Sequence, residues 1–249
     1  MKAATILLRS TFALLIVYLS ACEKINDFNK AKNCSIKKIH FFTQYENSEY
    51  DMDFYYNKWG NPDSVILNPS QMENPNLYFI YNNKKQLIVL QEAWNFGFPA
   101  ILHRFGYSRG IITTDSAVSF YSLVPFHHIT YFEYDRYGRI SKSTFVPTGQ
   151  PPYTIIVTTY QYDGEGNLIR PNQPLTYDNK INVQQLHPIW QFMARDYSLN
   201  NPIAAVQYNN FGLPTKFDVT PPPPFFHNFP FLGNTLNELG RSEIVYECK

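Results

Sequence analysis

The chain has 249 residues, of which 17% are aromatic and only 16% are charged, and its formal net charge at pH 7 is +1. This near-neutrality argues against a nucleic-acid partner, because nucleic-acid binding needs a basic field to neutralise phosphates. The 19 Tyr and 20 Phe residues favour a β-rich globular protein with ample material for a core.

The N-terminus has the three parts of an export signal. Lys2 and Arg9 form a positive region, and Thr11 to Leu19 form an apolar stretch. Spanning a bilayer takes roughly 18 apolar residues, so this stretch is too short to be a membrane helix. We therefore expect residues 1–21 to be a signal peptide.

The end of this segment, Leu19-Ser20-Ala21-Cys22, resembles the lipobox of bacterial lipoproteins. The resemblance implies diacylglyceryl transfer to the Cys22 sulfur, cleavage before Cys22 and acylation of its new amine, so the protein would be anchored to a membrane by lipid. Residues 22–33 would be the lipidated linker and residues 34–249 a single domain. Glu23 does not resemble an inner-membrane retention signal. We therefore expect the outer membrane of the cell envelope, on a face that the sequence leaves open.

Two further cysteines remain, Cys34 near the start of the domain and Cys248 near its end. Export places them in an oxidising compartment, which favours a disulfide over the alternative of two free buried thiols. The strand-like segments Ser35 to Thr43 and Ser242 to Tyr246 adjoin them. If these strands pair, the disulfide closes nearly the whole domain.

A short pattern recurs after residue 50: an apolar residue, one spacer, Tyr, and then Asp or Asn, often followed by Gly. Tyrosines 56, 81, 107, 134 and 162 are 25, 26, 27 and 28 residues apart, which indicates an internal repeat. Asp or Asn starts a turn and Gly supplies a positive φ, so each copy predicts a hairpin. Successive hairpins predict one antiparallel sheet. Further copies lie at Tyr208-Asn209 and, in part, at Tyr177-Asp178.

These copies resemble the YD repeats of the Rhs family, best at Tyr134-Asp135-Arg136-Tyr137-Gly138-Arg139-Ile140. They are still more similar to the YD-like repeats of small surface lipoproteins of Gram-negative bacteria, which are domains of unknown function. The resemblance covers most of residues 50–217, although the second and third copies lack the turn Gly at its usual place. It implies a mainly β, repeat-built sheet and brings no catalytic residues with it.

One segment breaks the strand pattern. From Val183 to Leu199, apolar residues recur at spacings of three and four, as on one face of a helix, and Pro188 is acceptable near the helix start. The pattern predicts one helix near residues 186–199, packed on the sheet. Its apolar positions are Leu186, Ile189, Trp190, Met193 and Tyr197.

Several aromatic residues are candidates for ligand binding. Four prolines at 221–224 favour a polyproline II segment in which Phe225 and Phe226 are either packed on the domain or displayed to a partner. Trp59, Tyr137 and Phe211 occupy predicted turns, where exposed rings could stack on sugars.

A possible hydrolase motif lies in the third copy of the repeat. Gly106-Tyr107-Ser108-Arg109-Gly110 matches the G-x-S-x-G elbow of serine hydrolases. That motif requires a strand-to-helix turn, whereas the β-branched residues that follow Gly110 predict a second strand. A hairpin turn is therefore the favoured interpretation, and no catalytic residue is assigned.

We expect neither a metal nor a cofactor. The adjacent His127 and His128 point to opposite faces of a strand and cannot share an ion. The segment that begins at Asp163 starts like a calcium loop, but Leu168 and Pro174 occupy the positions of the required Gly and Glu.

The sequence thus predicts a non-enzymatic, lipid-anchored binding or assembly protein of the cell envelope, whose partner, an envelope protein or a glycan, the sequence leaves open. A glycan-binding accessory lipoprotein is the alternative, and a hydrolase using Ser108 is the third hypothesis.

Overall fold

A computed structural model describes residues 31, 33–43, 49–68, 75–94, 98–120, 125–148, 154–169, 176–202, 206–218 and 239–249. The predicted signal peptide, the lipidation site Cys22 and the Pro/Phe segment with Phe225 and Phe226 lie outside the described residues.

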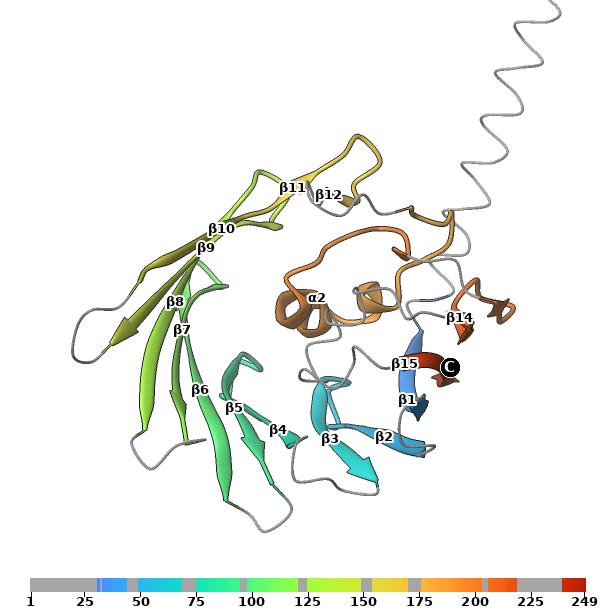
Figure 1. Cartoon of the computed structure of the whole chain (residues 1–249), viewed down its shortest axis with the longest axis horizontal. Coiled ribbons are helices and arrows are strands. Elements are labelled where there is room, and N and C mark those ends of the chain that lie inside the picture. The colour runs from blue at the N-terminus through green and yellow to red at the C-terminus, as the bar shows by residue number, and fades with distance from the viewer. Residues whose placement is uncertain are drawn as a thin grey trace, which may run out of the picture.

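The fold is mainly β, as predicted, and its largest element is an antiparallel sheet of 13 strands in the order β10-β9-β8-β7-β6-β5-β4-β3-β2-β1-β15-β14-β13. Figure 1 shows the sheet curving like a trough around a helix. Most strands that lie side by side in the sheet are also consecutive along the chain, so the sheet is a row of hairpins. The strands are β1 Cys34–Thr43, β2 Glu49–Tyr56, β3 Pro62–Asn68, β4 Asn76–Tyr81, β5 Leu87–Ala93, β6 Pro99–Ser108, β7 Ile111–Ser119, β8 Phe126–Tyr134, β9 Ile140–Thr148, β10 Ile156–Thr159, β13 Gln207–Tyr208, β14 Pro214–Asp218 and β15 Leu239–Cys248. A separate pair consists of β11 Gln161–Tyr162 and β12 Leu168–Ile169.

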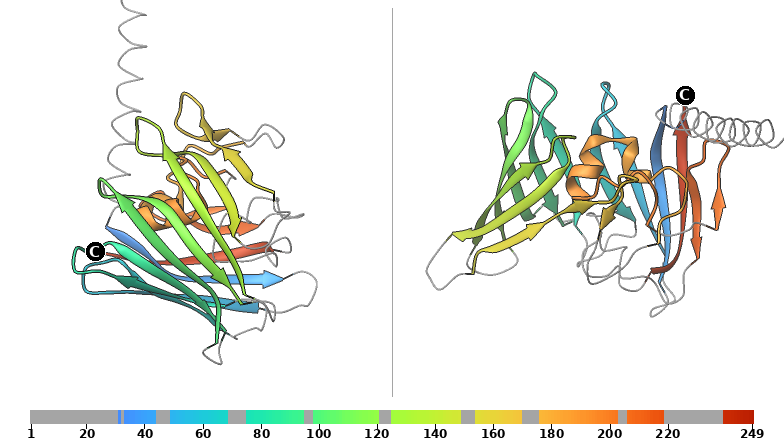
Figure 2. Two further views of the ribbon diagram at one scale, coloured as in Figure 1. Left: turned by 90° about the vertical axis from the view of Figure 1, so that its left-hand side faces the viewer. Right: turned by 90° about the horizontal axis from the view of Figure 1, so that it is seen from above.

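The first and last strands of the domain pair inside this sheet, two strands away from its β13 edge. Strands β1 and β15 pair antiparallel, with Cys34 directly opposite Cys248, and Figure 2 shows the two strands side by side. The cysteines form a disulfide with an S–S distance of 2.06 Å across a sequence separation of 214 residues. The predicted strand pairing and the predicted disulfide are both confirmed.

Five hairpin turns in the described chain are built from the same bonds. In each, the Oδ1 atom of an Asn or Asp accepts hydrogen bonds of 2.8 to 3.2 Å from the backbone N–H groups two and four residues later. The residue three positions later has a positive φ. These acceptors are Asn57, Asn82, Asp135, Asp163 and Asn209. The side chain therefore replaces a backbone acceptor at the start of each turn.

The copy without its glycine keeps the same turn. Lys85 occupies the left-handed position with a φ of 61°, where the other four turns have Gly. The copy at Tyr107 differs, because its turn is made by Arg109 and Gly110, with φ values of 49° and 84°. The second copy thus keeps the turn with a strained non-glycine residue, whereas the third copy, which has Ser108 in place of the Asp or Asn, forms a different turn that includes Gly110.

The repeated tyrosines connect neighbouring hairpins. The hydroxyls of four of them, and that of Tyr246 outside the repeat, donate 2.6 to 2.9 Å hydrogen bonds to backbone carbonyls at the start of the preceding return strand. Burial raises the pKa of Tyr134 to about 12, so its hydroxyl remains a donor across the physiological range. The bonds join Tyr81 to Pro62, Tyr107 to Leu87, Tyr134 to Ile112, Tyr177 to Leu168 and Tyr246 to Pro214.

The predicted helix forms, but it is shorter than expected. The chain makes a 3-10 turn η1, Val183–Leu186, and then helix α2, Pro188–Ala194. His187 is extended because it precedes a proline, and Pro188 lacks an N–H group, so no helix can run through this point. Arg195 then adopts a left-handed conformation with a φ of 51° and ends the helix, so the prediction of helix up to Leu199 is wrong.

Helix α2 fills the concave face of the sheet, which confirms the predicted packing (Figure 1). Trp190 is only 2% exposed, and its indole meets Phe54 and Phe79 edge-on, with ring centroids 5.7 Å apart in both pairs. Phe192 packs in the same way on Phe105 and Phe132. No helix of the described chain has both the length and the apolar character needed to cross a bilayer.

Candidate binding cleft

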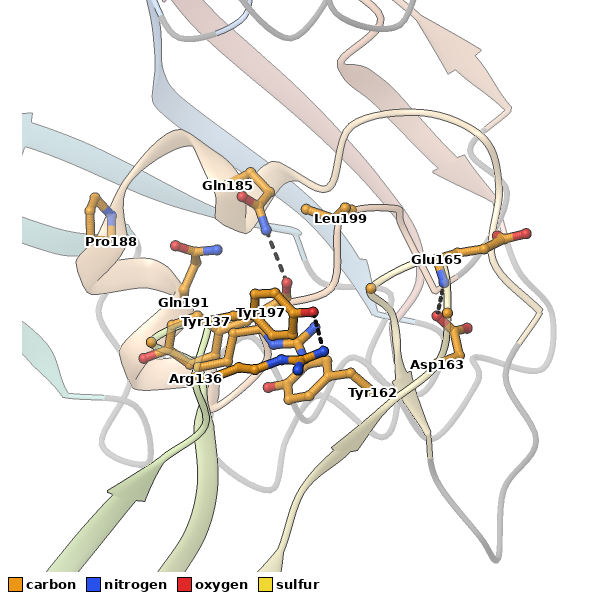
Figure 3. Close-up of a pocket in the computed structure, with 14 residues that line it drawn as sticks. Arg136, Tyr137, Tyr162, Asp163, Glu165, Gln185, Pro188, Gln191, Tyr197 and Leu199 are labelled. Carbon is orange, nitrogen blue, oxygen red and sulfur yellow. Dashed lines mark hydrogen bonds between the residues drawn. The ribbon is translucent and has the colours of Figure 1, made fainter. Parts of the chain in front are cut away.

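A cleft of about 900 Å³ lies where two repeat turns face the helical segment (Figure 3). One wall consists of the turns that begin at Asp135 and Asp163. Residues 185–199 supply the opposite wall. The sheet curvature brings these walls together, because β8 and β9 bend toward the helix (Figure 1).

The first wall holds a stack of alternating rings and guanidinium groups. The Arg139 guanidinium lies 3.9 Å from the Tyr162 ring centroid and 5.0 Å from that of Tyr137. Its Nη2 atom also pairs with the Asp135 carboxylate at 2.7 Å. Burial by itself would raise the pKa of Asp135, but hydrogen bonds from Arg139 and from the Tyr137 backbone outweigh it and lower that pKa. The stack is therefore a charged, rigid support for the turn.

Tyr137 is the most accessible ring in this stack, with 66% of its surface exposed. The Arg136 Nη2 atom donates a 2.7 Å hydrogen bond to its hydroxyl, and the guanidinium carbon lies 4.7 Å from its ring centroid. Arg136 makes no ion pair with a carboxylate of the described chain. Its charge and the outer part of Tyr137 are thus available to a ligand.

Two glutamines face this stack from the helical segment. Gln185 is held in place, because its Nε2 atom donates to the carbonyls of Tyr197 and Ser198 at 3.1 and 2.9 Å. Gln191 lines the same cleft as Tyr137 (Figure 3), and its side-chain amide bonds to no described residue. The cleft therefore offers an amide without a described partner, a guanidinium without a carboxylate partner and an aromatic ring, a combination that suits a polar ligand with flat apolar faces.

The other candidate aromatics lie away from the cleft. Trp59 is 46% exposed in the turn between β2 and β3, where the ammonium groups of Lys58 and Lys85 lie 5.2 and 5.9 Å from its ring centroid. Phe211 is half-buried and packs against a separate cluster that contains Cys34 and Leu213. Neither Trp59 nor Phe211 therefore lines the cleft that contains Tyr137.

The remaining sequence candidates occupy turns. Ser108 pairs with Ile111 across the hairpin of β6 and β7, so it does not lie on the strand-to-helix turn of a hydrolase elbow. The Asp163 segment forms one of the shared turns, in which Asp163 Oδ1 accepts two backbone hydrogen bonds. Within the described residues, no three His, Cys, Asp or Glu side chains are placed to hold a metal ion.

A buried charge cluster lies elsewhere on the sheet, on β5, β6 and β7. The Nδ1 atom of His103 lies 2.9 Å from Asp115 Oδ2, and its Nε2 atom lies 3.4 Å from Glu92 Oε1. Burial alone would lower the pKa of His103, but the two carboxylates outweigh it and raise that pKa to about 9. Sequence reasoning missed this cluster, because three residues spaced 11 and 12 positions apart carry no motif.

Neither a protein-family model nor a curated protein matches this chain.

Proposed function

We propose that this protein is a lipid-anchored lipoprotein of the outer membrane that acts by binding an envelope component, and that the cleft beside Tyr137 is its binding site. The observation that carries the proposal is the convergence of an exposed ring and a guanidinium without a carboxylate partner, both from the turn that begins at Asp135, with a side-chain amide from helix α2. The hairpin position of Ser108 supports binding over hydrolysis. The bonds shared by five turns support the assignment to YD-like repeats.

Within this function, a glycan is the ligand that the cleft favours. Sugar rings present apolar faces that stack on aromatic side chains, and their hydroxyls pair with amides and charged groups. Tyr137, Gln191 and Arg136 offer these three kinds of contact around one space. An envelope protein is the alternative ligand, for which the same cleft would receive a side chain of its partner.

The test is a binding screen with soluble protein starting at residue 23, which contains every described element. Glycans and solubilised envelope proteins are applied to the wild type, to Tyr137→Ala and to Trp59→Ala. Trp59 is the matched control, because it is an exposed aromatic in an equivalent turn outside the cleft. Binding that Tyr137→Ala abolishes and Trp59→Ala retains supports the cleft, whereas equal binding by both variants refutes it.

The anchor is tested separately in cells. Radiolabelled palmitate should label the full chain, and the label should disappear in Cys22→Ser while export continues. Labelling that persists in Cys22→Ser would contradict lipidation at this residue without touching the cleft proposal.

A further inference from the structure

One edge strand of the large sheet is fully exposed and uncharged. Strand β10 is the last strand of the sheet, and its four residues, Ile156 to Thr159, are all exposed. Ile155, Ile156 and Val157 each have more than half of their surface exposed, at 58%, 55% and 54%. Every residue from 155 to 159 is β-branched and none is charged. Natural edge strands are usually protected by charge, proline, a bulge or short length.

The opposite edge shows that protection. Strand β13 has only two residues, Gln207 and Tyr208, and a register irregularity interrupts its pairing with β14. A strand this short offers little to an incoming chain. The two edges of the sheet, as far as the described residues show them, therefore differ, and the β10 edge is the better suited to accept another strand.

The backbone of β10 is oriented for such an addition. Alternate residues of an antiparallel strand direct their N–H and C=O groups to opposite sides. The N–H of Tyr160 donates to the Ser141 carbonyl at 2.8 Å, toward β9. Residues at even spacing from Tyr160 also face β9, so Val157 and Thr159 present their N–H and C=O groups outward. Strand β12 pairs along this strand only from Gln161 onward, and no other described strand pairs with the outer side of β10.

The incoming strand must suit both faces of β10, because Ile156 and Val157 lie on opposite faces and both are exposed. The chain contains such a strand in β10 itself. An antiparallel pair related by a two-fold axis at Val157 places Val157 opposite its copy, Ile156 opposite Thr158 and Ile155 opposite Thr159. All these pairs are β-branched and uncharged, a favourable cross-strand combination without like-charge repulsion.

We propose that β10 is a dimerisation edge, through which two copies of this chain join their sheets antiparallel about a two-fold axis at Val157. The interface is isologous, because each copy contributes the same strand. The proposal is independent of the binding cleft. It adds a second interaction surface on the same domain and gives each assembly two copies of the cleft.

The experiment measures sedimentation of soluble protein starting at residue 23, from micromolar to near-millimolar concentration. The wild type should dimerise. Val157→Lys and Val157→Glu should each raise the dissociation constant at least about tenfold, because like charges then face each other across the axis. An equimolar mixture of the two variants should restore the dimer, since Lys then faces Glu.

The matched control is Val245→Lys. Val245 is also β-branched and is 49% exposed, but it lies on β15 in the interior of the sheet, so its substitution should leave the dimer intact. Circular dichroism of each variant verifies the fold. A wild type that stays monomeric overturns the proposal, and so does a Val157→Lys protein that dimerises as well as the wild type. A mixture that stays monomeric shows that Val157 does not face its own copy, which also overturns it.

Discussion

The buried imidazole of His103 should make the stability of the fold depend on pH. Its folded pKa is about 9, raised above its ordinary value of 6.5 by Asp115 and Glu92 against the opposing effect of burial. Below pH 6.5 the imidazole is protonated in both the folded and the unfolded chain, so the interaction contributes in full. Above pH 6.5 only the folded chain keeps the proton, and the contribution declines until it is lost above pH 9.

The size of this effect follows from the difference between the two pKa values. Each unit corresponds to roughly 1.4 kcal/mol, so the free energy of unfolding should fall by about 3 kcal/mol between pH 6.5 and 9 because of this residue. The side chain of His103 is only 16% exposed, so solvent screens the cluster little.

Urea unfolding of the wild type and of His103→Gln at several pH values measures the effect. The difference in the free energy of unfolding between the two proteins should shrink by about 3 kcal/mol as the pH rises from 6.5 to 9. His127→Gln is the control, because His127 is exposed on β8 and makes no ion pair with a described residue.

Parallel curves for the wild type and His103→Gln would refute the reasoning. If His103→Gln does not fold, the imidazole is titrated directly by NMR in the wild type. A midpoint for His103 below pH 7 would then contradict the assignment of a charged, buried imidazole.

Three further changes test the disulfide, the shared turn and the core. Replacing Cys34 and Cys248 by Ser should lower the free energy of unfolding by up to about 5 kcal/mol, and reduction of the wild type should give the same shift in urea midpoint. Lys85→Gly should increase the free energy of unfolding by about 1 kcal/mol and so raise the melting temperature, because it removes the strain of a non-glycine residue in the left-handed conformation. Gly138→Ala should decrease the free energy of unfolding by a similar amount and lower the melting temperature, because it introduces that strain. Trp190→Ala should lower the free energy of unfolding in urea by about 3 to 5 kcal/mol, because it leaves a cavity at the centre of the concave face. It should also weaken the near-ultraviolet circular dichroism. A decrease in the free energy of unfolding below about 1 kcal/mol would contradict this central role of Trp190.

The hairpins were predictable because their bonds are local. Asp135 reaches backbone groups only two and four residues away, so Asp followed by Gly is enough to specify the turn. The turn at Lys85 could not be predicted in the same way, since a lysine gives no sign that it will adopt a positive φ. The helix was predicted too long, because apolar spacing marked Tyr197 as helical while Pro188 and the left-handed Arg195 set the actual limits.

In the candidate site, too, the sequence predicted what depends on neighbouring residues and missed what depends on segments far apart in the chain. Tyr137 was identified as a possible binding residue from its place in a turn. Gln191, which lines the same cleft, was not, because more than 50 residues separate the two and the amide carries no motif. The cluster of Glu92, His103 and Asp115 was missed for a related reason. It depends on the register of three strands, β5, β6 and β7, which no single stretch of sequence specifies.

The sequence by itself therefore determined the antiparallel hairpins, the location of the helical segment and the cysteine pair, since each depends on residues close in the chain or on a choice among very few partners. The tertiary structure decided the rest. Curvature of the sheet around α2 creates the cleft beside Tyr137, and the strand order leaves β10 at a bare edge (Figure 1). Both features arise from the relative placement of segments far apart in the chain, which depends on the packing of the whole core and not on any single stretch of sequence.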